Sequence, residues 1–143
     1  MIALIQRVTE ARVEVDGKNI GQIGRGILAL VGVERGDGEA QAERLVEKVL
    51  GYRIFPDDAG KMNLSLADIK GGLLVVPQFT LAADTKTGTR AGFSTAASPD
   101  DGLRLFALFV ELSKKKNPET KKSGKVKSGK YKIRKNKIRK KQN

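Results

Sequence analysis

The charge of this chain is divided so unevenly that only its first part can build a hydrophobic core. Residues 113–143 hold 15 of the 28 Lys and Arg residues but only one of the 16 Asp and Glu residues, so their net charge is +14. Residues 1–112 hold the remaining 13 basic and 15 acidic residues, a net charge of −2. A segment so charged buries too little apolar surface to offset the entropy lost on ordering. We therefore expect a near-neutral domain over 1–112 and a disordered Lys/Arg-rich tail over 113–143.

The composition excludes several kinds of chemistry. The chain has no Cys and no His, which rules out disulfides, thiol nucleophiles, an imidazole general base and metal sites built on those ligands. We therefore predict no metal site. Catalysis would have to use carboxylates, Lys, Tyr, hydroxyls, backbone amides or a group on the substrate. No apolar run is long enough to span a membrane, and the first residues do not resemble a signal peptide, so we expect a cytoplasmic protein without a membrane partner.

Apolar patterning predicts an α+β domain. Alternating or continuous apolar runs indicate strands at 2–8, 11–15, 20–23, 27–33, 52–55 and 73–76. Helical spacing indicates one helix over 39–50, with Asp37 as its N-cap, and a second one that begins at Ser98-Pro99. The second helix would bury an apolar stripe made of Leu103, Phe106, Ala107 and Val110. The expected architecture is a mixed or antiparallel, barrel-like sheet with two packed helices.

The strongest local signal for chemistry follows the strand at 73–76. Pro77 ends that strand, and Gln78, Thr80 and Asp84 then offer an amide, a hydroxyl and a carboxylate. The backbone N–H groups of Phe79 and Thr80 would be available to bind an oxyanion. The alternative is a capped strand end whose polar groups satisfy one another. Residues 86–97 form a long connection of the kind that carries function.

Other candidate residues are open to two interpretations. Met62 would line a pocket or simply pack, and Arg7, at the end of the first strand, would bind a ligand or be solvated. Phe93 in the long connection is expected to be exposed or half-exposed.

Four segments together resemble the D-aminoacyl-tRNA deacylase family. They are residues 1–13, 51–55, 61–64 and 78–84, which occur in the expected order and spacing within a match that runs to about residue 112. The resemblance implies a homodimer that needs no cofactor, and we expect no DNA specificity. It implies a carboxylic-ester hydrolase that cleaves the bond between a D-amino acid, or glycine, and the 3′-terminal adenosine of tRNA. Such an enzyme acts in translation quality control.

The resemblance also implies roles for individual residues. The family signature Ser-Gln-Phe-Thr corresponds to residues 77–80, with Pro in place of Ser. Two mechanisms stay open: either Thr80 attacks the ester, or the ribose 2′-hydroxyl of the tRNA handles the proton while the Phe79 amide binds the oxyanion. Without a side-chain base, Thr80 is better suited to positioning than to attack. The implied catalytic residues are Gln78, Phe79 and Thr80, and the implied substrate-binding residues are Arg7, Met62, Pro77 and Phe93.

The end of the chain departs from the family. A second signature, Asn-x-Gly-Pro-Val-Thr, would project into the partner's active site and exclude L-amino acids, but this chain contains no Gly-Pro dipeptide. The Lys-rich segment in its place suggests a frameshift near residues 113–122, or else a natural truncation or replacement. If the tail is genuine, we expect impaired chiral selection and stronger non-specific RNA binding. The alternative function is therefore an impaired deacylase that acts as a basic-tailed, non-specific RNA-binding protein.

Overall fold

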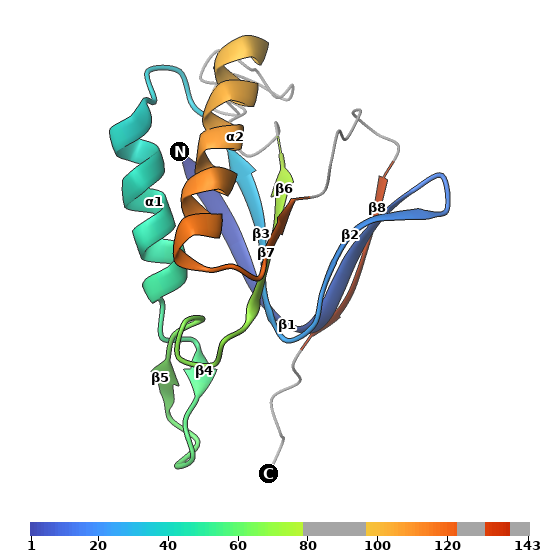
Figure 1. The fold of residues 1–143 in the computed structure, drawn as a ribbon, viewed down its shortest axis with the longest axis vertical. Coiled ribbons are helices and arrows are strands. Elements are labelled where there is room, and N and C mark those ends of the chain that lie inside the picture. The colour runs from blue at the N-terminus through green and yellow to red at the C-terminus, as the bar shows by residue number, and fades with distance from the viewer. Residues whose placement is uncertain (79–96, 123–130, 138–143) are drawn as a thin grey trace, which may run out of the picture.

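The computed structural model describes residues 1–78, 97–122 and the backbone of 131–137 (Figure 1). Two helices and a mixed sheet account for most of these residues, which confirms the predicted α+β class. No helix in the described ranges is long and apolar enough to cross a membrane. The elements are β1 (Ile2–Val15), β2 (Lys18–Ile23), β3 (Gly26–Gly32), α1 (Glu39–Gly51), β4 (Phe55–Pro56), β5 (Met62–Leu64), β6 (Gly72–Pro77), α2 (Pro99–Lys116), β7 (Thr120–Lys122) and β8 (Tyr131–Lys137).

The first strand is longer than expected and curls the sheet. Two strands were predicted over 2–8 and 11–15, but β1 is one continuous strand. Its first half pairs antiparallel with β3, and its second half pairs antiparallel with both β2 and β8. The strand order is β2-β1-β3-β6-β7, with parallel pairing between β3 and β6 and between β6 and β7. The long strand β1 therefore belongs both to the part of the sheet with β3 and to the part with β2 and β8. The mixed sheet bends between these two parts into a nearly barrel-like form (Figure 1).

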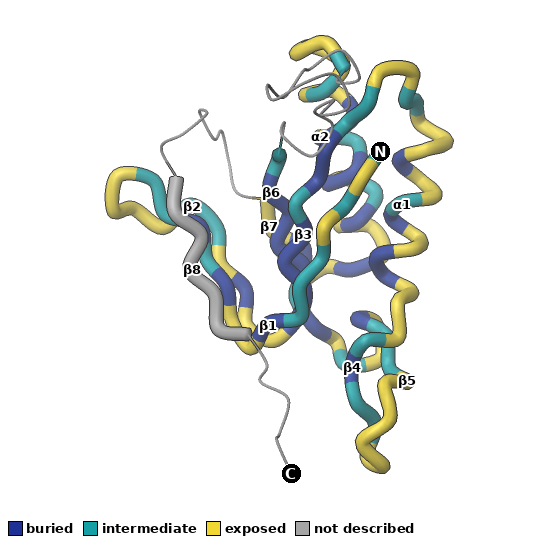
Figure 2. Tube along the Cα trace, turned by 180° about the vertical axis from the view of Figure 1, so that it is seen from behind, coloured by how far each residue is buried: buried dark blue, intermediate teal, exposed yellow. Residues whose placement is uncertain are grey.

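Strands β3 and β6 are buried on both faces, as their continuous apolar runs predict. Figure 2 shows most of both strands as buried, with α1 and α2 on one side and the curled β1–β2 pair on the other. Leu28, Leu74 and Val76 pack toward β1 and β2. The helix side of the core contains Ile27, Ala29, Val31, Leu73, Val75, Val46, Val49, Phe106 and Phe109.

Two glycines bring β3 and β6 together at the start of their parallel ladder. Gly26 pairs with Gly72. A Cβ built on Gly26 would lie 1.9 Å from the Gly72 carbonyl oxygen, far inside an ordinary contact. Just before this pair, the Gly72 N–H donates to the Arg25 carbonyl at 3.0 Å. Glycine at residue 26 therefore fixes how closely the two central strands approach.

Helix α2 begins at the cap that the sequence predicts, whereas helix α1 does not. Ser98 caps α2 as predicted, since its Oγ accepts from the Asp101 N–H at 3.3 Å. Asp37 does not cap α1, for which Gly38 is the N-cap. The Asp37 carboxylate instead accepts from the Glu34 N–H and pairs with the Met1 ammonium, both at 2.7 Å. The competing cation at the start of β1 explains why the capping prediction was wrong.

The predicted apolar stripe of α2 was only half right. Phe106 and Val110 are buried as expected, but Leu103 and Ala107 are exposed, and Leu105 and Phe109 are buried in their place. Apolar residues lie on several sides of this helix, so periodicity did not determine which side faces the sheet. Packing against the sheet decided it.

The folded part of the chain continues past residue 112, where the charge pattern placed the boundary. Helix α2 runs to Lys116, and β7 adds a parallel strand beside β6. Ser113, Asn117 and Thr120 are buried. Backbone pairing and small polar side chains order this stretch, which explains how a segment poor in apolar residues belongs to the fold. The backbone of β8 pairs with β1, and the rest of the expected tail lies outside the described residues.

Candidate functional site

The carboxyl end of β6 places Gln78 beside the end of β3. Pro77 pairs with Val31 in the last step of the parallel ladder. The Gln78 N–H then donates to the Val31 carbonyl at 2.9 Å, which fixes the backbone just where the strand ends. Pro77 and Gln78 are both half-buried. The backbone at Pro77 and Gln78 is thus held against the end of β3.

A small apolar cavity lies next to this anchor. It has a volume of about 30 Å³, enough to hold a water molecule. The Ala97 N–H donates to the Val33 carbonyl at 3.1 Å and brings the start of α2 to the same place. The cavity lining comes from β3, β6 and α2: Val31, Val33, Pro77, Gln78, Ala97, Gly102, Leu103 and Phe106.

Sequence reasoning missed the contribution of α2 to this cavity. Leu103 was assigned to the core, yet it is 62% exposed and lines the cavity. The one available signal was the position of this helix directly after the long connection at 86–97. Three predicted site residues, Phe79, Thr80 and Phe93, lie outside the described residues.

Arg7 and Met62 come together at a second place. The Arg7 Nη1 donates to the Ile54 carbonyl at 2.7 Å and contacts the Met62 Sδ at 2.9 Å. This interaction ties β1 to the short β4–β5 hairpin. Arg7 is therefore half-buried and anchored instead of solvated, while the Met62 side chain is 49% exposed beside it.

The structure does not bring Arg7 and Gln78 together within one chain. Arg7 pairs with Ile27, and Ile27 pairs with Leu73, five residues before Gln78. Five residues of strand span about 17 Å, and two sheet spacings add about 10 Å sideways. The predicted site residues therefore form two groups, one at the end of β6 and one at the β4–β5 hairpin. Within the described ranges, no three acidic residues are arranged to hold a metal ion.

Comparison with known proteins gives consistent results. The sequence profile of the D-Tyr-tRNA(Tyr) deacylase family matches residues 4–138. A D-aminoacyl-tRNA deacylase of Alkalilimnicola ehrlichii is 63% identical over 114 residues, which are 80% of this chain and 76% of that protein. One of Thioalkalivibrio sulfidiphilus is 65% identical over 113 residues, or 79% and 76% of the two chains.

Two solved structures share the fold. A c-Myc DNA unwinding element binding protein superposes with a TM-score of 0.85 and 32% identity, covering 94% of this chain and 90% of that one. A probable eukaryotic D-amino acid tRNA deacylase superposes with a TM-score of 0.74 over 94% and 92% of the two chains, and at 16% identity it supports the fold alone. The profile match and the identities above 60% establish that this chain belongs to the D-Tyr-tRNA(Tyr) deacylase family.

Proposed function

We propose that this protein hydrolyses the ester bond of D-aminoacyl-tRNA, and of glycyl-tRNA, to release free tRNA and the amino acid. The observation that carries the proposal is the identity above 60% to D-aminoacyl-tRNA deacylases. The anchored backbone at Gln78 supports it, because Gln78 is the second residue of the signature segment 77–80. The same comparisons favour an enzyme over a basic-tailed RNA-binding protein. The cytoplasm, where charged tRNA is found, is the proposed location.

We propose a substrate-assisted reaction in which the chain supplies position and backbone donors. Water attacks the ester carbonyl carbon, and the bond to the ribose 3′-oxygen breaks. The proton lost by water passes to that oxygen through the neighbouring 2′-hydroxyl. The Phe79 N–H binds the oxyanion, and Gln78 and Thr80 hold the ester in place. The absence of His and Cys supports this division of roles, since no such side chain is available to activate Thr80.

A substrate change and a pair of variants test the chemistry. The assay is hydrolysis of D-tyrosyl-tRNA whose terminal adenosine carries or lacks the 2′-hydroxyl. Removing this hydroxyl should slow hydrolysis about 10²-fold or more, the usual contribution of a proton-transfer group. Thr80→Val should keep measurable activity, and Thr80→Ser should restore the original rate. Complete loss in Thr80→Val together with full activity on the 2′-deoxy substrate would instead assign the attack to Thr80.

Chiral selection is tested with the same assay and a paired L-tyrosyl-tRNA control. The family signature that excludes L-amino acids contains Gly-Pro, and this chain has no such dipeptide. We expect weakened discrimination, with cleavage of both the D-ester and the L-ester. Cleavage of the D-ester alone would show that another part of the chain excludes L-amino acids.

We further propose that the chain works as a homodimer. Ile2 and Leu4 of β1 are 37% and 48% exposed, an apolar strip that a second copy would cover. Leu4→Lys should shift sedimentation equilibrium toward monomer, whereas Ala107→Lys on the exposed side of α2 should not. An unchanged mass for Leu4→Lys would contradict this interface.

A further inference from the structure

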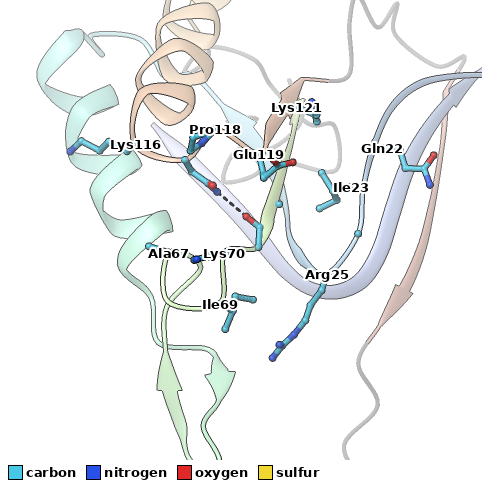
Figure 3. Close-up of a pocket in the computed structure, with 14 residues that line it drawn as sticks. Gln22, Ile23, Arg25, Ala67, Ile69, Lys70, Lys116, Pro118, Glu119 and Lys121 are labelled. Carbon is cyan, nitrogen blue, oxygen red and sulfur yellow. Dashed lines mark hydrogen bonds between the residues drawn. The ribbon is translucent and has the colours of Figure 1, made fainter.

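A large hollow lies at the other end of β6 from Gln78. It is an open cleft with a volume of about 690 Å³, within the range of ligand sites. Three segments far apart in sequence surround it: the β2–β3 turn, the loop before β6 and the connection from α2 to β7 (Figure 3). Gly72 and Gln78 are six residues apart, so the two places are separated by about 20 Å along the strand.

Hydrogen bonds hold these three segments in a fixed arrangement. The Gly72 N–H donates to the Arg25 carbonyl at 3.0 Å, and the Leu73 N–H donates to the Glu119 carbonyl at 3.1 Å. The buried Asn117 side chain donates to the Gly71 carbonyl at 3.1 Å, the dashed line in Figure 3. The cleft is therefore framed by paired backbone, which is what a preformed binding site requires.

The cleft is lined by an excess of positive charge. Among the described residues that line it, the basic ones are Arg25, Lys70, Lys116 and Lys121, and the acidic one is Glu119. Lys116 is engaged elsewhere, since its Nζ pairs with Glu47 of α1 at 3.6 Å. The other three basic residues form no ion pair within the described part of the chain. Arg25 and Lys70 belong to residues 1–112, whose net charge is −2, whereas Lys116 and Lys121 belong to the basic segment 113–143.

Local structure constrains two of these basic residues, Arg25 through its side chain and Lys70 through its backbone. The Arg25 guanidinium lies 5.4 Å from the centre of the Phe55 ring, a contact that orients it and leaves its N–H donors available for an anion. Lys70 adopts a left-handed backbone with φ of 52°, which is uncommon for a residue with a side chain. None of the described residues that line the cleft is aromatic. It is thus suited to phosphate groups, not to stacked bases.

We propose that this cleft binds phosphates of the RNA backbone, as a second contact for the substrate whose 3′ end reaches Gln78. The inference rests on the proposed function for the identity of that RNA. About six nucleotides would cover the 20 Å between the two places if they were stacked as in one strand of B-form DNA, at roughly 3.4 Å per nucleotide. The contact is independent of base sequence, because phosphates are common to all RNA.

The test compares two double variants of the full chain. Arg25→Gln/Lys70→Gln removes two cleft cations, and Lys18→Gln/Arg44→Gln removes an exposed Lys and an exposed Arg elsewhere. Binding of uncharged tRNA is followed by fluorescence anisotropy at 50 and 200 mM salt. The measured quantity is the ratio of the affinity at 50 mM salt to the affinity at 200 mM salt. Loss of two phosphate contacts should make this ratio roughly tenfold smaller in the cleft variant. The control should keep the ratio seen with the unsubstituted chain.

Kinetics on two substrates separate this inference from the proposed function. With D-aminoacyl-tRNA the cleft variant should show KM raised about tenfold with kcat unchanged. With D-aminoacyl-adenosine, which has no backbone to reach the cleft, both constants should stay the same. Equal effects in the two double variants, or none in the cleft variant, would overturn the cleft assignment. A chain that hydrolyses neither ester refutes the proposed function, while anisotropy still decides the cleft.

Discussion

Replacing Gly26 with alanine tests the close approach of the two central strands. The added Cβ would lie 1.9 Å from the Gly72 carbonyl oxygen, whereas ordinary contacts begin near 3.4 Å, so β6 would have to retreat by about 1.5 Å. That movement breaks the 3.0 Å bond from the Gly72 N–H to the Arg25 carbonyl. Loss of this partly exposed hydrogen bond costs about 1 kcal/mol, and overpacking costs about 1–3 kcal/mol more. We expect a loss of about 3 kcal/mol in the free energy of unfolding.

Gly24→Ala is the matched control, since a Cβ there meets nothing within 4 Å. It should change stability by less than about 1 kcal/mol and can even stabilise the chain by restricting the unfolded state. Urea unfolding followed by far-UV circular dichroism measures both variants. The melting temperature of Gly26→Ala should fall by roughly 12 °C or more. A difference below about 1 kcal/mol between the two variants would refute the contact between β3 and β6.

Three further predictions concern single side chains. Ser113→Ala should be neutral or stabilising by up to about 1 kcal/mol in urea unfolding, because the buried Ser113 Oγ has no hydrogen-bond partner among the described residues; a loss above 1 kcal/mol would reveal a partner. Hydrogen bonds from the Ser65 N–H and hydroxyl hold the pKa of Asp68 below its ordinary value of 3.8. Because this pKa is lowered on folding, its contribution to stability is present above pH 3.8 and is lost as the pH falls through the lower value. NMR titration should show the shift, and Ser65→Ala should move the pKa upward. Arg7→Met should cost about 1–3 kcal/mol by removing the charged donor to the Ile54 carbonyl, and an unchanged urea midpoint would contradict that contact.

The sequence alone determined the local features of this protein. Continuous apolar runs at 27–33 and 73–76 predicted strands buried on both faces, because only such strands lack a polar side. Ser98-Pro99 predicted the start of α2, since a serine cap and a proline at the first helical position act within a few residues. The motif order also indicated the family, which the comparisons confirm.

Only the tertiary structure decided which distant segments meet. Arg7 is anchored by a carbonyl 47 residues away, and the cleft beside Gly72 is assembled from three separate segments. The domain continues past residue 112 because β7 pairs through its backbone with β6, and backbone groups are the same whatever the side chain. A count of charged side chains therefore cannot predict this strand pairing. Local patterns reveal periodicity and caps, whereas the partners of a hydrogen bond depend on the whole chain being in place.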